Sequence, residues 1–330
     1  MDGRGVIMDM IRQKKKVTEC RTVSLSTGWI LVMALLPVIL GACSVKRTAV
    51  NMVGNTLSGG GAVYASDDDP ELIREAIPFG LKTFESLLAI SPDNQGLLLS
   101  AASGFSSYAY MLQDEADRLD QTDLTRARAL RERARKLYLR GRDYALRWLE
   151  LEHLNFIESL KKDPGSTLAK TTEGDVPFLY WAGVSWAGAL SAAKDDVTLI
   201  GDLPLAGALV YRVLEIDDTY NDGAAHEFLI SYEGSRPGGS IRLARKHYER
   251  ALEISGGRRA SVYLALAQSV VIREQNVEEF SELIEAAIAV NPDKVPELRL
   301  VNTMARRRAQ WLKKTIPNFF VEAEQKEVTK

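Results

Sequence analysis

The stretch Ala244-Arg-Lys-His-Tyr248-Glu-Arg-Ala251-Leu-Glu-Ile-Ser-Gly256 decides the fold class. A small residue, an aromatic residue four positions later and an alanine three positions after that share one face of a helix. The glycine five residues further on is typical of a helix end. The same spacing recurs at Gly80, Phe84, Leu87 and Pro92, at Gly141, Ala145, Trp148 and His153, at Ala206, Val210, Val213 and Asp218, and at Phe280, Ile284, Ala287 and Pro292.

This spacing is typical of the second helix of a tetratricopeptide repeat. The turns after these helices also align: Leu88-Ala-Ile-Ser-Pro, Leu149-Glu-Leu-Glu-His, Leu214-Glu-Ile-Asp-Asp, Leu252-Glu-Ile-Ser-Gly and Ile288-Ala-Val-Asn-Pro. They lie 61, 65, 38 and 36 residues apart. The last two intervals are close to the usual repeat of about 34 residues, and the first two require inserted helices. Strand-type alternation is absent, so the sequence predicts an all-α solenoid of tetratricopeptide-like helix pairs with inserted helices.

The composition and net charge limit the classes of function that this protein can have. The chain has 330 residues, of which 46% are hydrophobic and 26% charged, as in ordinary globular proteins. A formal net charge of −2 argues against binding to nucleic acid. The basic cluster between Arg126 and Lys136 is interpreted as the solvated face of a long amphipathic helix over residues 126–152.

The amino terminus predicts an export signal and a lipid anchor. A basic region at Arg12 and Lys14–Lys16 precedes the apolar run Trp29–Leu40, which is too short for a comfortable membrane span. Leu40-Gly-Ala-Cys43 then matches the lipobox of bacterial lipoproteins, in which the cysteine thiol receives the lipid. We expect residues 1–42 to be a signal peptide and the mature protein to be a periplasmic lipoprotein that contacts the membrane through this lipid only. Ser44 favours the outer membrane; an uncleaved anchor is the alternative.

The predicted domains follow from the composition downstream of this cysteine. Residues 43–69 contain glycine and aspartate runs and are interpreted as a tether. Asp69 is a predicted N-cap with Pro70 at the first helical position, so the helical repeat domain is expected to span residues 70–320. Residues 321–330 remain as a C-terminal tail.

Catalytic and metal-binding patterns are weak. The three histidines, His153, His226 and His247, lack the spacing of four residues that helical zinc ligands use. His226 precedes Glu227 near a helix start, where an acid–base pair is conceivable and a structural histidine is the simpler interpretation. We therefore expect a protein that is not an enzyme and that holds no cofactor and no metal.

One aromatic stretch offers a candidate binding region. Residues 178–193 are almost entirely apolar and include Tyr180, Trp181 and Trp186. A helix that is apolar on all sides must be enclosed, and Gly183 and Gly188 permit close packing. The stretch is either a central core helix or the lining of an apolar cavity or channel.

The chain resembles the T component of TRAP transporters. The resemblance rests on Tyr180-Trp181 with Trp186, Lys194-Asp-Asp196, Leu214-Glu-Ile-Asp-Asp-Thr-Tyr220-Asn221, Gly223-Ala224, His226-Glu-Phe228, Gly238-Gly239, Ala244, His247-Tyr248, Ala251–Arg258, Pro296–Leu300, Arg307, Arg308 and Trp311.

This resemblance implies a function that composition and spacing do not give. Members are periplasmic lipoproteins with cryptic tetratricopeptide repeats, which form homotrimers with a pore through each protomer. They associate with the periplasmic solute-binding protein of the transporter, and their ligand is a small hydrophobic molecule. Tyr180, Trp181 and Trp186 would then line the apolar path, with Tyr220, Asn221 and His226 as a polar cluster beside it. The rival function is a tetratricopeptide-type scaffold lipoprotein in outer-membrane or cell-wall assembly.

Overall fold

The computed structural model describes residues 46–57 and 59–320. The chain divides into two compact units, residues 1–53 and 54–330. The described residues of the first unit, 46–53, are helical. Cys43, the predicted signal peptide and the tail 321–330 lie outside the described residues. In the part of the chain that is described, the elements are helices and no β-strand occurs, which confirms the all-α fold class.

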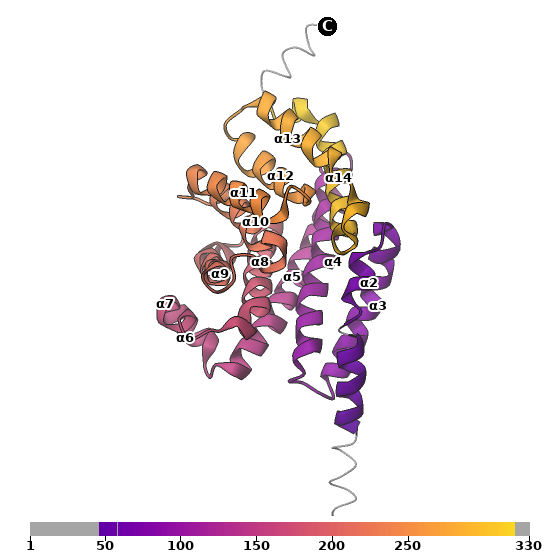
Figure 1. The fold of residues 1–330 in the computed structure, drawn as a ribbon, viewed down its shortest axis with the longest axis vertical. Helices are drawn as coiled ribbons and strands as arrows, with labels where there is room; N and C mark the ends of the chain where they lie inside the picture. Colours follow the sequence, from indigo (N-terminus) through magenta and orange to yellow (C-terminus); the bar gives the residue numbers. More distant parts are fainter. Residues whose placement is uncertain (1–45, 58, 321–330) are drawn as a thin grey trace, which may run out of the picture. The chain divides into compact units, whose positions relative to one another are not determined.

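The helices of the second unit are shown in Figure 1. They are α2 (Gly61–Ala65), α3 (Pro70–Leu88), α4 (Gln95–Leu119), α5 (Leu124–Glu152), α6 (Phe156–Lys162), α7 (Pro164–Leu168), α8 (Val176–Ala192), α9 (Val197–Ile216), α10 (Tyr220–Ser235), α11 (Ile241–Ser255), α12 (Ala260–Leu266), α13 (Val277–Ala289) and α14 (Arg299–Lys314). A π-helix, Ala267–Val271, follows α12 directly. Consecutive helices pack against one another along most of the chain.

The helix ends match the turns that the sequence predicts. The helices α3, α5, α9, α11 and α13 each end within one of the five aligned turns. The Asp69 carboxylate accepts hydrogen bonds from the backbone of Glu71 and Leu72 and so caps α3. Gly256 takes a left-handed conformation with φ of 56° at the end of α11, which costs a glycine little. The tetratricopeptide geometry of the helix pairs stays a prediction.

The apolar aromatic stretch forms α8, which is enclosed as its composition requires. It packs against α4, α5, α9 and α10. An ideal Cβ on Gly183 would lie 2.7 Å from the Ala206 carbonyl oxygen of α9, and one on Gly188 would lie 2.6 Å from the Tyr138 ring of α5. Both glycines therefore allow neighbouring helices to approach α8 more closely than a side chain would permit.

We expect Gly183→Ala to destabilise the protein by about 2 kcal/mol, because overpacking a close helix contact forces the backbones apart. Gly201→Ala is the matched control, since no atom lies within 4 Å of a Cβ at this position of α9. It should stabilise the helix by up to about 1 kcal/mol. Urea unfolding of both variants checks this; equal effects of the two would contradict the close approach of α8 and α9.

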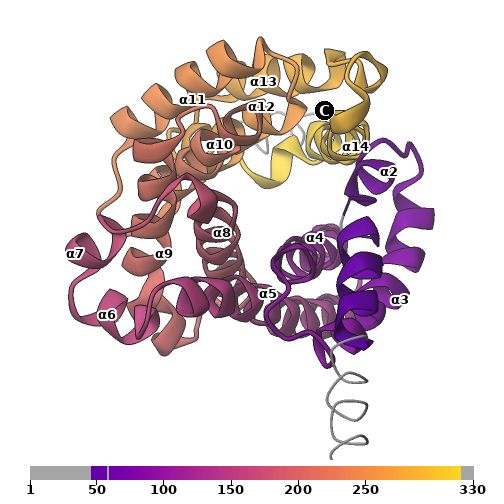
Figure 2. The ribbon, with the colours of Figure 1, turned by 60° about the horizontal axis from the view of Figure 1, so that its bottom comes forward.

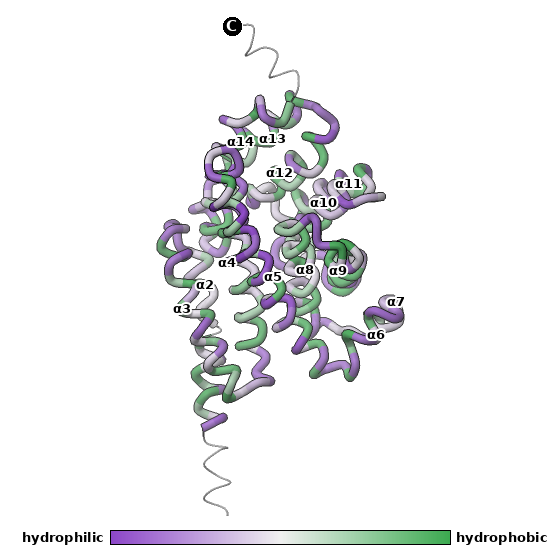
Figure 3. Tube along the Cα trace, turned by 180° about the vertical axis from the view of Figure 1, so that it is seen from behind, coloured by the Kyte–Doolittle hydropathy of each residue, from purple (hydrophilic) through white to green (hydrophobic). Residues whose placement is uncertain are grey.

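Among the described residues, one helix, α9, is long and apolar enough to cross a membrane by length and composition. Figure 3 shows its hydrophobic colour along the helix. A core helix of a soluble protein passes the same criterion. In this structure α9 packs against α8 and α10 and buries Ala206, Leu209 and Val213.

The second unit closes on itself. Its last long helix, α14, contacts α2 and α3, so the helices follow one another around a ring (Figure 2). Arg299 donates to the Ser66 carbonyl oxygen at 3.2 Å, and Arg307 pairs with Glu71 at 2.6 Å. These contacts join residues more than 230 positions apart in the sequence, and they give the unit an inner wall as well as an outer surface.

Candidate functional site

Three of the predicted site residues meet in one aromatic cluster. The ring of Tyr180 on α8 lies 5.2 Å from that of Trp181 in an edge-to-face arrangement and 5.3 Å from that of Tyr220. Tyr220 is the first residue of α10, so the cluster joins two helices. Burial raises the pKa of Tyr220 to about 12, with a smaller contribution from Asp217. The phenol therefore stays protonated and is a hydrogen-bond donor at neutral pH.

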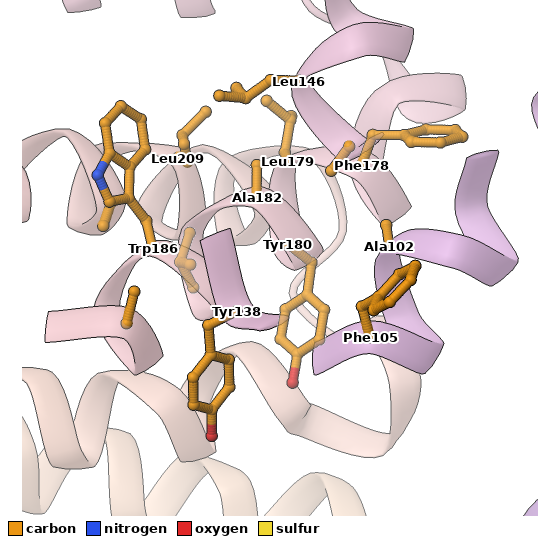
Figure 4. Close-up of a cluster of buried hydrophobic side chains, with 14 of the residues drawn as sticks. Ala102, Phe105, Tyr138, Leu146, Phe178, Leu179, Tyr180, Ala182, Trp186 and Leu209 are labelled. Atoms are coloured by element: carbon orange, nitrogen blue, oxygen red, sulfur yellow. The ribbon is translucent and has the colours of Figure 1, made fainter. Parts of the chain in front are cut away.

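Trp186 does not join this cluster. Its ring is buried and lies 4.9 Å below the guanidinium of Arg142 from α5. The Nε1 atom of the indole is enclosed without a hydrogen-bond partner. Figure 4 shows the ring well apart from Tyr180. This placement is that of a packing residue between α5 and α8.

The start of α10 contains a left-handed turn. Asn221, Asp222 and Gly223 have φ values of 47°, 59° and 83° in succession. These residue types tolerate this region best, but three in a row cost conformational energy. The turn is held by Arg259, which donates to the Asn221 carbonyl oxygen and pairs with Glu227 at 2.9 Å. Arg259 is 6% exposed, so this ion pair fixes the turn from inside the protein.

His226 is buried and belongs to a partly buried chain of hydrogen bonds. Its Nε2 lies 2.7 Å from Asp218 and its Nδ1 lies 2.9 Å from Nδ1 of His247 on α11. Since the carboxylate accepts from Nε2, a neutral His226 accepts at Nδ1 from His247. Arg250 also donates to Asp218. The described residues contain no group of three or more histidine, cysteine, aspartate or glutamate side chains that could hold a metal ion.

The His226 site has a carboxylate partner, as acid–base chemistry would need. However, the side chain is 5% exposed and both ring nitrogens are engaged within the protein. Although burial opposes it, the hydrogen bonds from Arg250 and His226 lower the pKa of Asp218, so that carboxylate stays ionised. This arrangement connects α10 to α11 and orients both rings.

A second polar cluster lies on the inner wall of the ring, around Tyr110 of α4. Tyr110 keeps 46% of its surface exposed, but protein atoms crowd around its hydroxyl, and the resulting loss of solvation raises its pKa, as does the charge of Asp114. The charges of Arg308 on α14 and Glu227 on α10 also act on its hydroxyl. These charges belong to α4, α10 and α14, so the Tyr110 hydroxyl lies within electrostatic reach of all three helices.

Two further tyrosines extend this inner wall. Tyr138 of α5 interacts electrostatically with Tyr110, and Tyr180 of α8 interacts with Glu227. Figure 4 shows that Tyr138 and Tyr180 both direct their hydroxyls away from Leu146, Leu179 and Phe178. We call Tyr110, Tyr138, Tyr180 and Glu227 the inner-wall cluster.

The ring closes beside this cluster through Arg308. Its guanidinium lies 3.4 Å from Asp114 and 3.3 Å from Asp117 on α4, and 3.0 Å from Gln268 in the π-helix. It also stacks over Trp311 at 4.7 Å. Burial raises the pKa of Asp114, although its arginine neighbours act in the opposite direction. A cavity of about 50 Å³ adjoins this closure, lined by Pro70, Glu71, Arg74, Met111, Asp114, Arg118, Met304 and Arg307.

Sequence reasoning missed Tyr110, Tyr138, Asp218 and the Arg308 closure. One sequence pattern could have indicated Tyr110. Tyr110, Asp114 and Asp117 are spaced by four and three residues, which places them on one helix face. An acidic pair beside a tyrosine is unusual for a face that packs against other helices. Tyr138, Asp218 and the Arg308 closure each depend on contacts between helices that are distant in the sequence, so no local pattern indicates them.

Comparison with known proteins agrees with the resemblance that the sequence carries. The model of the family described as TRAP transporter T-component matches residues 66–320. An uncharacterized protein of Treponema pallidum (strain Nichols) is 26% identical over 306 residues, which cover 86% of this chain and 95% of the relative. The matched segment includes the aromatic cluster, the left-handed turn, the histidine pair and the Arg308 closure. The chain therefore belongs to the TRAP transporter T-component family.

Proposed function

We propose that this protein is a lipid-anchored periplasmic accessory of a TRAP transporter, which binds the transporter's solute-binding protein and collects or passes a small organic ligand along the inner wall of its ring. It acts by binding and not by catalysis. The family membership carries this proposal, because T components belong to a transport system. The homotrimer and the outer-membrane location are part of the same proposal; they come from the family resemblance and from Cys43-Ser44.

The architecture supports a binding role. Repeat-type helical proteins offer extended concave surfaces, and this one has an inner wall to which α4, α5, α8 and α10 contribute tyrosine and glutamate side chains. His226, the candidate for acid–base chemistry, is 5% exposed and has both ring nitrogens engaged within the protein. The rival function in envelope assembly has no comparable support, since the family match points to transport.

A pull-down tests the proposed partner. A soluble form, residues 44–330, would be immobilised and mixed with periplasmic extract, and the retained proteins identified by mass spectrometry. Recovery of a TRAP solute-binding protein is the expected result. Recovery of assembly proteins without a solute-binding protein would favour the rival scaffold function.

A separate experiment tests the proposed lipid anchor on Cys43. We expect the full chain to incorporate radiolabelled palmitate in a bacterial host and the Cys43→Ala variant to lose the label entirely, because the thiol is the acceptor of the lipid. Cys20→Ala is the matched control and should retain the label. Equal labelling of both variants would contradict a lipid on Cys43.

A further inference from the structure

The exposed apolar side chains of this protein are concentrated in the first described part of the chain. Thirteen large apolar side chains are exposed among the described residues, and seven of these lie between residues 52 and 79. The seven are Met52, Val53, Leu57, Val63, Tyr64, Leu72 and Phe79. Single exposed apolar residues are ordinary, but a contiguous group indicates a surface that contacts an apolar partner.

One exposed side of α3 is a stripe without charged residues. Its members are Leu72, Ala76, Phe79, Thr83 and Ser86, which we call the α3 stripe. They recur at intervals of three and four residues, which places them on one side of the helix. Leu72 is 55% exposed and Phe79 is 81% exposed.

The two hydroxyl groups of the α3 stripe already have partners within the helix. Thr83 donates a hydrogen bond to the Phe79 carbonyl oxygen at 3.0 Å, and Ser86 donates one to the Lys82 carbonyl oxygen at 2.8 Å. A hydroxyl that is bonded to the preceding turn loses less free energy when water leaves it. The whole stripe can therefore enter an apolar environment at little cost.

Helix α2 extends this surface. The Tyr64 hydroxyl of α2 would lie 3.4 Å from an ideal Cβ on Gly80, the residue after Phe79. Figures 1 and 2 show α2 and α3 side by side. Val63, the neighbour of Tyr64, is 70% exposed. The apolar surface thus has contributions from two helices.

Charged side chains beside the α3 stripe form ion pairs with one another or with α14. Lys82 pairs with Glu85 at 2.6 Å, and Glu71 pairs with Arg307 at 2.6 Å. Long charged side chains at the edge of an apolar surface can keep their ends in water while the surface itself is covered. Because both signs of charge are present, we expect an apolar attraction that does not depend on anionic lipids.

The length of the chain places this surface near the predicted lipid anchor. Eleven peptide bonds separate Cys43 from Gly54, so the two residues lie at most about 40 Å apart. An ideal Cβ on Gly54 would lie 2.9 Å from Leu97, and Asn94 donates a hydrogen bond to Asn55 at 3.1 Å, both at the start of α4. This point follows the end of α3 after a short turn. A lipid on Cys43 would therefore hold the α3 stripe within reach of the bilayer.

We propose that the α3 stripe, together with Val63, lies against the membrane and inserts its apolar side chains among the lipid headgroups, as amphipathic interfacial helices do. The lipid attaches the protein, and the stripe is a second contact that orients the ring of helices on the membrane. This inference rests on the lipid anchor of the proposed function and goes beyond the expectation from the sequence, in which the lipid is the single membrane contact. A second protein on the same surface is the alternative that the test distinguishes.

Fluorescence quenching of the full chain in vesicles tests the proposal. Ala76→Cys places a labelling site within the stripe and keeps its large side chains, and Ala129→Cys is the matched control, an exposed alanine on a mostly charged side of α5. Cys20 would leave with the signal peptide and Cys43 would carry the lipid, so a nitrobenzoxadiazole dye attaches to the introduced thiol. The protein would be reconstituted into phosphatidylcholine vesicles with and without lipids that carry a nitroxide on the acyl chain.

We expect the nitroxide lipids to quench the dye at Ala76→Cys by at least about twofold and to leave the dye at Ala129→Cys nearly unchanged, because an interfacial residue lies at the level of the upper acyl chain. Dissolved iodide should quench the two dyes in the opposite order. A second substitution, Phe79→Gln, should reduce the quenching by lipid at Ala76→Cys to about half, because it removes the most exposed apolar side chain of the stripe. Leu154→Gln is the matched control, since Leu154 is 88% exposed between α5 and α6, and it should change nothing.

Three results would overturn the proposal. Equal quenching of the two dyes by lipid would mean that the stripe has no preferred contact with the bilayer. Protection of the dye at Ala76→Cys from both iodide and nitroxide lipid would show that a second copy of the chain or another protein covers the stripe. Flotation of the same vesicles reports on the anchor separately: protein that floats without quenching keeps the anchor and refutes the stripe contact, whereas protein that does not float refutes both.

Discussion

Replacing Arg308 with methionine is expected to lower the free energy of unfolding by about 3 kcal/mol, because the change leaves two carboxylates of α4 without a partner from α14. Asp114 is 9% exposed, so water replaces the lost guanidinium poorly. The variant also loses the hydrogen bonds to Gln268 and the stacking over Trp311. Methionine keeps most of the side-chain length, so the loss reports on the charge and the hydrogen bonds. Urea unfolding followed by circular dichroism measures it.

The neighbouring arginine is the matched control. Arg307 pairs with Glu71, but both side chains are largely exposed, and an exposed ion pair contributes at most about 1 kcal/mol. Arg307→Met should therefore cost far less than Arg308→Met, although both change one charge on the same helix. Equal losses for the two variants would mean that the ring is not held closed through Asp114 and Asp117.

The helices of this protein could be predicted from the sequence because their determinants are local. Asp69 caps α3 through the backbone two and three residues ahead, and Gly256 ends α11 by its own conformation. The ring closure had no such local determinant. Arg308 meets Asp114 across 194 residues of sequence, and an arginine on an amphipathic helix is ordinarily a solvated residue.

The candidate site was predictable to a similar extent. Tyr180 and Trp181 are neighbours in the sequence, and the aromatic helix that contains them was recognisable from its composition. Tyr220 joins them only because α10 packs against α8. Tyr110 escaped attention because a tyrosine close to methionine, leucine and alanine is typical of a helical core, whereas this side chain is 46% exposed and interacts with charges on α10 and α14.

The histidine pair predicts a dependence of stability on pH. Burial lowers the pKa of His247 from 6.5 to about 4, and a proton on His226 acts in the same direction, although Glu233 and Asp218 act in the opposite direction. Below pH 6.5 the unfolded chain protonates this side chain while the folded protein does not, so stability is complete above pH 6.5 and falls as the pH decreases toward 4. Between pH 7 and pH 5 the free energy of unfolding should fall by about 2 kcal/mol from this residue alone.

Urea unfolding at pH 7, 6 and 5 measures this fall, and the range stays above the pKa values of ordinary carboxyl groups. His247→Asn removes the titrating group while retaining a side chain that donates a hydrogen bond, so its stability should fall by about 2 kcal/mol less over the same range. His153→Asn is the control, because His153 contacts Asp175 and takes no part in the pair. If His247→Asn kept the full pH dependence of the unchanged protein, protonation of the α10–α11 contact would not be what weakens the fold in acid.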